Sequence, residues 1–168
     1  MKQLLTSLLI YFISAVLFVA CNDKTASSTT EEIRPTFDLA GARKTIDSLN
    51  AVFGSMVSKG DSVGLASLYT SDAKFMMPNS PTVSGRSAIQ SAFAGLFAAM
   101  GTPGLKLTTT DIWGTEELIT EVGSYSMTDQ SGKEIETGKY IDLWKMEDGK
   151  WKLHRDIFNS DNPAAPSK

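Results

Sequence analysis

The sequence predicts an α+β domain in which three N-terminal helices pack on a mostly antiparallel sheet. Apolar residues recur at helical spacing up to about residue 100, and beyond Gly104 they alternate as they do in strands. The stretch 138–158 contains two alternating runs joined by a tight turn at Glu147-Asp148-Gly149. Helices first and strands afterwards indicate a segregated α+β arrangement.

Three helices are expected in the first part of the domain. Residues 38–58 carry apolar side chains at helical intervals, and Gly60 marks the end of this helix. A shorter helix capped by Asp61 or Ser62 continues through Tyr69. Residues 86–100 form the third helix, which Gly101 ends.

Five strands are expected. Residues 72–77 form a short strand that Pro78 stops, and a loop follows over residues 79–85. Four further strands follow one another along the chain, over residues 105–113, 117–128, 134–146 and 150–158. Helices cover only one face of such a sheet, so the other face needs a second cover.

The overall composition restricts the classes of function. The chain has 168 residues, 42% of them hydrophobic and 21% charged, as in soluble globular proteins. The net charge of −3 and the lack of a Lys/Arg cluster argue against nucleic acid as a partner. One cysteine excludes an intrachain disulfide framework, and one histidine argues against a zinc site. We therefore expect no metal and no cofactor.

The N-terminus, residues 1–21, has the features of a secretory signal. Lys2 precedes an apolar run that ends in small residues at the only cysteine, Cys21. The segment Leu17-Phe18-Val19-Ala20-Cys21 resembles a bacterial lipobox, which implies cleavage before Cys21 and lipidation of its thiol. This predicts a lipoprotein of the bacterial cell envelope, with its domain outside the cytoplasm. An uncleaved anchor helix and an ordinary secretory signal are the alternatives.

Composition divides the remainder of the chain into three parts. Residues 22–36 are small and polar, which predicts a flexible tether to the membrane. Residues 37–161 form the globular domain. Residues 162–168 are polar and contain two prolines, so this tail should leave the domain.

The two strands of the stretch 138–158 predict a lined pocket. In the first strand Tyr140, Asp142 and Trp144 share a face. In the second strand strict alternation puts His154, Asp156 and Phe158 on one face, which we take as the inward one. It puts Trp151, Leu153 and Ile157 on the outer face, where a homodimer would cover them.

Two segments carry a resemblance to a known family. GDSVGLASLYTSDAKFMMPNSPTVSGRSAI, residues 60–89, resembles a helix, a strand and the Gly-Arg helix opening of SnoaL-like, ketosteroid-isomerase-like domains. DGKWKLHRDIFNSD, residues 148–161, is similar to the final strand of the same superfamily, which also contains nuclear transport factor two. The resemblance implies a cone-shaped fold with a curved sheet. That fold carries many functions, so it specifies none.

The steroid isomerase motif is only partly present. The resemblance places the family's oxyanion-hole tyrosine at Phe53 and its catalytic aspartate at Met77, and neither residue can do that chemistry. The second oxyanion donor, an aspartic acid kept protonated by an apolar site, falls on Asp142. The pocket positions implied by the family are Tyr69, Phe93, His154, Asp156 and Phe158.

Three functions remain open at this point. The first is an envelope lipoprotein whose pocket binds a small, largely apolar or amphipathic molecule. The second is an isomerase, dehydratase or cyclase that uses His154 with Asp142 or Asp156 as acid–base group. The third is a dimerisation domain without a ligand that holds an envelope partner. The expected ligand-binding residues are Phe53, Tyr69, Met77, Phe93, Tyr140, Trp144 and Phe158.

Overall fold

The computed structural model describes residues 36–163. The predicted signal peptide over residues 1–21, lipidation at Cys21, nearly all of the tether 22–36 and residues 164–168 of the polar tail lie outside the described residues. Among the helices of the described part, none has the length and apolar character that a membrane span requires.

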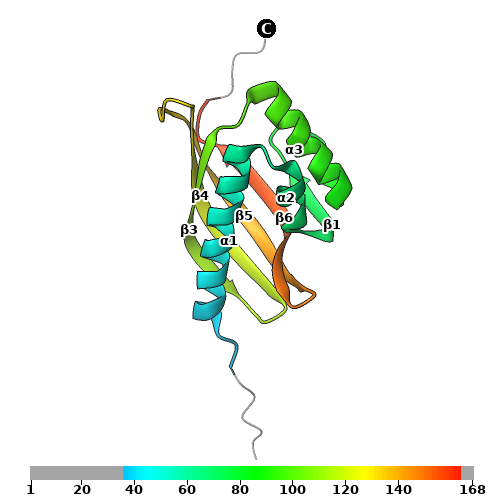
Figure 1. The fold of residues 1–168 in the computed structure, drawn as a ribbon. Coiled ribbons are helices and arrows are strands. Elements are labelled where there is room, and N and C mark those ends of the chain that lie inside the picture. The colour runs from blue at the N-terminus through cyan, green and yellow to red at the C-terminus, as the bar shows by residue number, and fades with distance from the viewer. Residues whose placement is uncertain (1–35, 164–168) are drawn as a thin grey trace, which may run out of the picture. The chain divides into compact units, whose positions relative to one another are not determined.

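The described domain consists of three helices packed on one face of a six-stranded curved sheet (Figure 1). The helices are α1 (Leu39–Lys59), α2 (Ser62–Ser67) and α3 (Arg86–Met100). The strands are β1 (Tyr69–Met76), β2 (Val83–Ser84), β3 (Gly104–Gly114), β4 (Leu118–Thr128), β5 (Glu134–Glu147) and β6 (Lys150–Ser160). The predicted α+β arrangement is confirmed.

Local capping explains where the first two helices begin. Asp38 accepts a hydrogen bond from the Gly41 backbone N–H at 2.9 Å, and Asp61 accepts one from Gly64 at 2.8 Å. Gly60 ends α1 in the left-handed conformation, with φ of 68°. These boundaries agree with the predicted ones except that Tyr69 begins β1 instead of extending α2.

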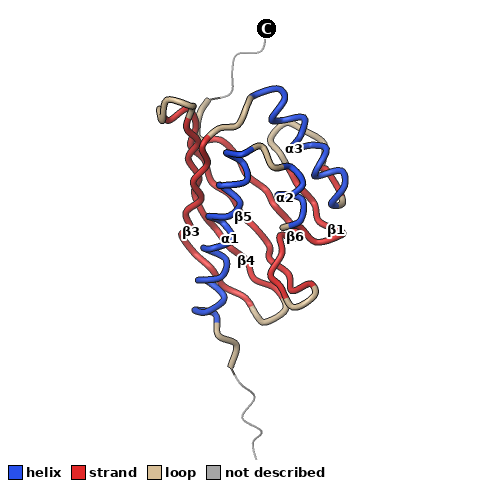
Figure 2. The backbone as a smooth tube through the Cα atoms, in the orientation of Figure 1, coloured by secondary structure: helices blue, strands red, loops and turns tan. Residues whose placement is uncertain are grey.

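The strand order is β2-β1-β6-β5-β4-β3, so the first strand of the chain lies beside the last (Figure 2). The pairing of β1 with β6 is parallel and brings Phe75 opposite Asp156. All other pairings are antiparallel. The short strand β2 lies inside the segment predicted as a loop.

A β-bulge at His154 changes which side chains of β6 face the helices. Asp142 pairs with Asp156 and Trp144 pairs with Leu153, so β6 has one residue more than β5 in this interval. Because of the extra residue, Leu153 and Asp156 both face inward. The prediction that Trp151 and Leu153 lie on the outer face is therefore wrong, and both belong to the hydrophobic core.

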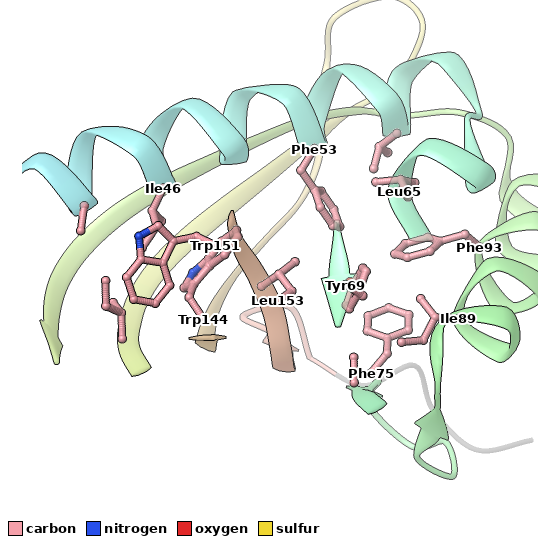
Figure 3. Close-up of a cluster of buried hydrophobic side chains, with 14 residues drawn as sticks. Ile46, Phe53, Leu65, Tyr69, Phe75, Ile89, Phe93, Trp144, Trp151 and Leu153 are labelled. Atoms are coloured by element: carbon pink, nitrogen blue, oxygen red, sulfur yellow. The ribbon is translucent and has the colours of Figure 1, made fainter. Parts of the chain in front are cut away.

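The core lies between the helices and the inner face of the sheet (Figure 3). Ile46 of α1 packs with Trp144 and Trp151 in one part of it. In the other part, Leu65, Tyr69, Phe75, Ile89 and Phe93 lie among α2, α3 and β1. Burial of a large apolar side chain stabilises a fold by roughly 1.5–3 kcal/mol.

Candidate functional site

A cavity of about 260 Å³ lies between α1, α3 and the inner face of the sheet. Seven aromatic rings line it, together with aliphatic and methionine side chains. The aromatic residues are Phe53, Phe75, Phe93, Phe97, Tyr125, Tyr140 and Phe158. The polar side chains that reach it are Asn50, Glu136, Asp142 and Asp156. A mostly apolar cavity with a few polar groups is typical of small-molecule sites.

The structure brings seven of the ten predicted site residues to this cavity, namely Phe53, Met77, Phe93, Tyr140, Asp142, Asp156 and Phe158. Tyr69, Trp144 and His154 are not among the lining residues. Tyr69 and Trp144 are fully buried; Tyr69 donates to the lining residue Asp156, and Trp144 donates to Glu121, which does not line the cavity. His154 lies elsewhere.

The most unusual feature of the cavity is a pair of buried carboxyl groups. Asp142 of β5 and Asp156 of β6 oppose each other directly, and they are only 5% and 7% exposed. Tyr69 donates a hydrogen bond to Oδ2 of Asp156. Oδ1 of Asp142 is buried without a hydrogen-bond partner among the described residues. Buried polar atoms are rarely left unpaired, so this oxygen is a candidate ligand contact.

Burial determines the protonation of the pair. It raises the pKa of Asp142 well above the ordinary value, and the neighbouring Asp156 and Glu121 raise it further. Burial also raises the pKa of Asp156, to about 6, although the hydrogen bonds from Tyr69 and Asp142 act in the opposite direction. These shifts favour a state in which the two carboxyls together hold one proton near neutral pH.

A buried carboxylate at Glu121 supports the wall next to this pair. Its Oε1 accepts hydrogen bonds from Asn50 Nδ2, Thr109 Oγ1 and Tyr140 Oη, each at 2.7 Å. The single hydroxyl hydrogen of Thr109 is shared with Oδ1 of Asp47, which also lies at 2.7 Å. Oε2 of Glu121 accepts from Trp144 Nε1, also at 2.7 Å. Four donors compensate the burial of this fully inaccessible side chain. They also hold the Tyr140 ring at the edge of the cavity.

Sequence reasoning did not identify Glu121, although a signal was present. Ile119, Glu121, Gly123 and Tyr125 alternate along the strand predicted over residues 117–128. The structure shows that all four face inward. An acidic residue at an inward position between apolar ones indicates a buried polar network.

Two glycines make room for the tyrosines of the cavity wall. Gly123 lies opposite Tyr140, and Gly138 lies opposite Tyr125. A Cβ atom at Gly123 would overlap the Tyr140 ring, and one at Gly138 would overlap the Tyr125 ring. Each ring therefore lies across the glycine of the neighbouring strand, which sets its position over the sheet.

His154 does not share the cavity with Asp142 and Asp156, so that prediction is wrong. Its Nδ1 lies 3.1 Å from Oγ1 of Thr70 and 3.4 Å from Oδ1 of Asp72, away from the cavity. The bulge at His154 is the physical cause, because it keeps Leu153 and Asp156 inward and turns the residues between them away. Burial and the adjacent Arg155 lower the pKa of His154, so its imidazole is mainly neutral at neutral pH.

The exposed part of the cavity lining lies at the end of α3 and the start of β5. Met100 and Ile135 line the cavity and are 66% and 50% exposed, respectively. Next to them, Tyr125 donates a hydrogen bond of 2.7 Å to Glu136. Asp142 and Asp156, in contrast, are in the enclosed part of the lining.

Arg86 at the start of α3 serves the fold. Its guanidinium donates to the backbone carbonyl of Tyr69 at 2.8 and 3.0 Å and pairs with Glu147 at 2.7 Å. These bonds fix the backbone at the residue whose hydroxyl contacts Asp156. Among residues 36–163, no group of three His, Cys, Asp or Glu side chains is arranged to hold a metal ion.

Comparisons with known proteins agree with this architecture. An NTF2-like protein with a cystatin-like fold from Novosphingobium aromaticivorans has a TM-score of 0.64 and 20% identity over 75% of this chain and 86% of that chain. A protein of unknown function with a cystatin-like fold from Nostoc punctiforme has a TM-score of 0.65 and 18% identity over 76% and 96%. The yeast UBP3-associated protein BRE5 has a TM-score of 0.61 and 20% identity over 73% and 98%.

At these identities the solved structures define the fold alone. No curated protein matches the chain. The model of the SnoaL-like domain family, in contrast, matches residues 49–154, which is more than half of the sequence and includes Asp142. The chain belongs to the SnoaL-like domain family.

Proposed function

We propose that the protein binds a small, largely apolar molecule in the cavity and that Asp142 anchors the one polar group of this ligand. The observation that carries the proposal is the buried Oδ1 atom of Asp142, which has no partner among the described residues and belongs to a side chain that lines the cavity. A hydrogen bond from a ligand would remove the free-energy cost of leaving this atom unpaired, about 1–3 kcal/mol.

The walls of the cavity account for the apolar character of the ligand. Aromatic rings from α1, α3, β1 and β6 surround it, and Met77 and Met127 add adaptable surface. Each Å² of apolar surface that a ligand buries here contributes roughly 25 cal/mol to binding before the entropic costs are counted.

Steroid isomerisation by the family's known residues is not supported. Phe53 and Met77 both line the cavity, at the positions where the resemblance puts the hydroxyl donor and the general base. A phenyl ring and a thioether supply neither. Of the three residues of that motif, only the aspartic acid at Asp142 is present.

A second candidate is an isomerase, dehydratase or cyclase that uses the carboxyl pair for proton transfer. The observation that favours it is the direct opposition of Asp142 and Asp156, with Tyr69 bonded to the latter. Two carboxyls with perturbed pKa values in an apolar site are suited to acid–base catalysis. In this version His154 has no part, because it lies away from the cavity.

We also propose that the protein is anchored to a membrane through its N-terminus. Residues 1–21 have the pattern of a lipoprotein signal, and Cys21 would carry the lipid. The protein would then be an envelope lipoprotein whose domain is outside the cytoplasm.

The test is calorimetric titration of the full chain in lipid nanodiscs with 2-ethylnaphthalene, a rigid apolar probe, with empty nanodiscs as the reference. Leu96→Trp fills the cavity from α3 and should abolish binding, whereas Ala98→Trp, exposed on the same helix, should leave it unchanged. His154→Ala should also leave binding unchanged. Equal binding by wild type and Leu96→Trp would reject the cavity as the binding site.

A further inference from the structure

The hydrogen-bond donors around the cavity are already engaged. Tyr140 donates to Glu121 and Tyr125 donates to Glu136, both at 2.7 Å. Tyr69 donates to Asp156, and the Asn50 amide donates to Glu121. Each tyrosine has one O–H, so no tyrosine hydroxyl remains for a ligand.

Hydrogen-bond acceptors at the cavity, in contrast, are not all paired within the described residues. Oδ1 of Asp142 has no partner among the described residues. Burial and mutual repulsion favour a single proton on the two carboxyls, so their oxygens are mostly acceptors. A ligand that meets these oxygens must bring the hydrogen itself. A carbonyl or carboxylate group would place two acceptors against each other.

The ionisable side chains that line the cavity are all acidic, apart from tyrosine. These acidic side chains are Glu136, Asp142 and Asp156, and Glu121 lies directly behind. No lysine, arginine or histidine is among the described residues that line the cavity. Such a lining repels anions, including fatty-acid carboxylates, and attracts cations. The aromatic walls favour a cation further, because the faces of the rings are electron-rich.

We infer that the cavity selects hydrophobic amines, with the ligand's ammonium group bound at Asp142 and Asp156 and its apolar part enclosed by the aromatic walls. This inference rests on the proposed binding function and specifies its ligand class. The ammonium donates to carboxyl oxygens of the pair, and the net negative charge of the pair balances its positive charge. A neutral alcohol of the same shape supplies the hydrogen bond without the charge.

The pH dependence distinguishes this ligand class from a carbonyl compound. The groups that face the pair are Tyr69 on β1, Glu121 on β4, Tyr140 on β5 and Asn50 on α1, and none is basic. The pair becomes negative as Asp156 loses its proton near pH 6. Binding of an ammonium ion therefore strengthens as the pH rises from 5 to 8. A carbonyl ligand, which needs a proton from the pair, would show the reverse.

The experiment titrates the full chain in nanodiscs with three probes of one skeleton, 2-(2-naphthyl)ethylamine, 2-(2-naphthyl)ethanol and 2-naphthylacetate. We expect the amine to bind at least tenfold more tightly than the alcohol at pH 8, with a preference that shrinks at pH 5, and the acetate not to bind. Asp156→Asn removes the negative charge of the pair, so it should reduce amine affinity at least tenfold and alcohol affinity less than threefold. Asp111→Asn, an exposed position on β3, is the matched control and should change neither.

The outcomes separate the two proposals. If 2-ethylnaphthalene and the alcohol bind but the amine is no tighter, the amine inference is overturned and the binding function stands. Tighter binding of the acetate, or amine binding that weakens from pH 5 to 8, overturns the inference as well. If no probe binds, both proposals fall. The wild-type pH series decides the question even if Asp156→Asn does not fold.

Discussion

Asp142 and Asp156 face each other directly across β5 and β6, on the side of the sheet that the helices cover. Two acidic side chains in this position destabilise each other when both are ionised, so the folded protein keeps a proton between them. The arrangement costs stability at high pH and leaves one buried carboxyl oxygen, Oδ1 of Asp142, without a hydrogen-bond partner among residues 36–163. Costs of this kind are typical of functional sites.

The carboxyl pair should make stability depend on pH in a specific direction. Both pKa values are raised in the folded state, so the folded protein binds protons that the unfolded chain releases. Their contribution to the free energy of unfolding is fully present below about pH 4, the aspartate pKa in the unfolded chain. It is lost as the pH rises through about 6 for Asp156 and through a higher value for Asp142. From pH 4 to pH 8 the free energy of unfolding should therefore fall less for Asp142→Asn than for wild type, by on the order of 1–3 kcal/mol.

Urea unfolding at a series of pH values measures this difference. In the control Asp111→Asn, at an exposed position, the free energy of unfolding should change with pH as it does in wild type. If the free energy of unfolding of Asp142→Asn changes with pH in the same way as that of wild type, ionisation of the carboxyl pair does not destabilise the fold.

Glu121 should be essential to the fold. Glu121→Gln replaces one acceptor oxygen by a donor and leaves it facing Trp144 Nε1 or the three donors on Oε1. The expected loss in free energy of unfolding is about 2 kcal/mol. Guanidinium denaturation measures it, with the exposed Glu117→Gln as control, which should change stability by less than 0.5 kcal/mol or so. A Glu121→Gln variant as stable as the control would contradict the network.

Gly123 should tolerate no side chain. Gly123→Ala puts a methyl group into the space of the Tyr140 ring, which must leave Glu121 or push the strands apart. Overpacking of this kind costs about 1–3 kcal/mol. Thermal unfolding of Gly123→Ala against the exposed neighbour Ser124→Ala is the measurement. The combined change Gly123→Ala and Tyr140→Leu should recover part of the loss, because the ring is then absent.

We propose that the outer face of the sheet forms a homodimer. An apolar row crosses four strands there, in which Met76 pairs with Ile157, Ile157 with Ile141 and Ile141 with Val122. The two isoleucines are 47% and 46% exposed. Trp151 and Leu153, which sequence alternation assigned to this face, contribute nothing to it because they are in the core.

Light scattering on the purified protein tests the dimer. Ile141→Lys should convert a dimer to a monomer, because a charge would be buried at the interface without a partner. Val63→Lys is the matched control, since Val63 is 63% exposed on α2 at the helical side and should not affect assembly. A wild-type monomer at micromolar concentration rejects the proposal.

Cys21 should become the lipid-modified first residue of the mature protein. Its position after Val19-Ala20, at the end of the apolar run, is the basis for this expectation. Mass spectrometry of the membrane fraction should find a chain that starts at Cys21 and carries added acyl mass. An intact Met1, or a soluble mature form, contradicts it, and Cys21→Ser should abolish the modification.

The sequence by itself determined the elements and much of the cavity. The periodicity of residues 38–58 and 86–100 and the caps at Asp38, Asp61 and Gly60 depend on neighbours in the chain, so helix boundaries could be predicted. Alternation in β5 correctly put Tyr140, Asp142 and Trp144 on the inward face. The family resemblance placed Phe53, Met77 and Phe93 at the cavity.

Only the tertiary structure decided the role of His154 and the composition of the two sheet faces. Alternation predicts the face of a residue only where the register between two strands is regular. The extra residue in β6 depends on how this strand pairs with β5 and β1, and the local sequence does not indicate that pairing. The four donors to Glu121 come from three elements that are separate in sequence: Asn50 from α1, Thr109 from β3, and Tyr140 and Trp144 from β5. A buried polar group is satisfied by whatever the fold brings within 3 Å or so, and that depends on packing, which single-chain periodicity does not encode.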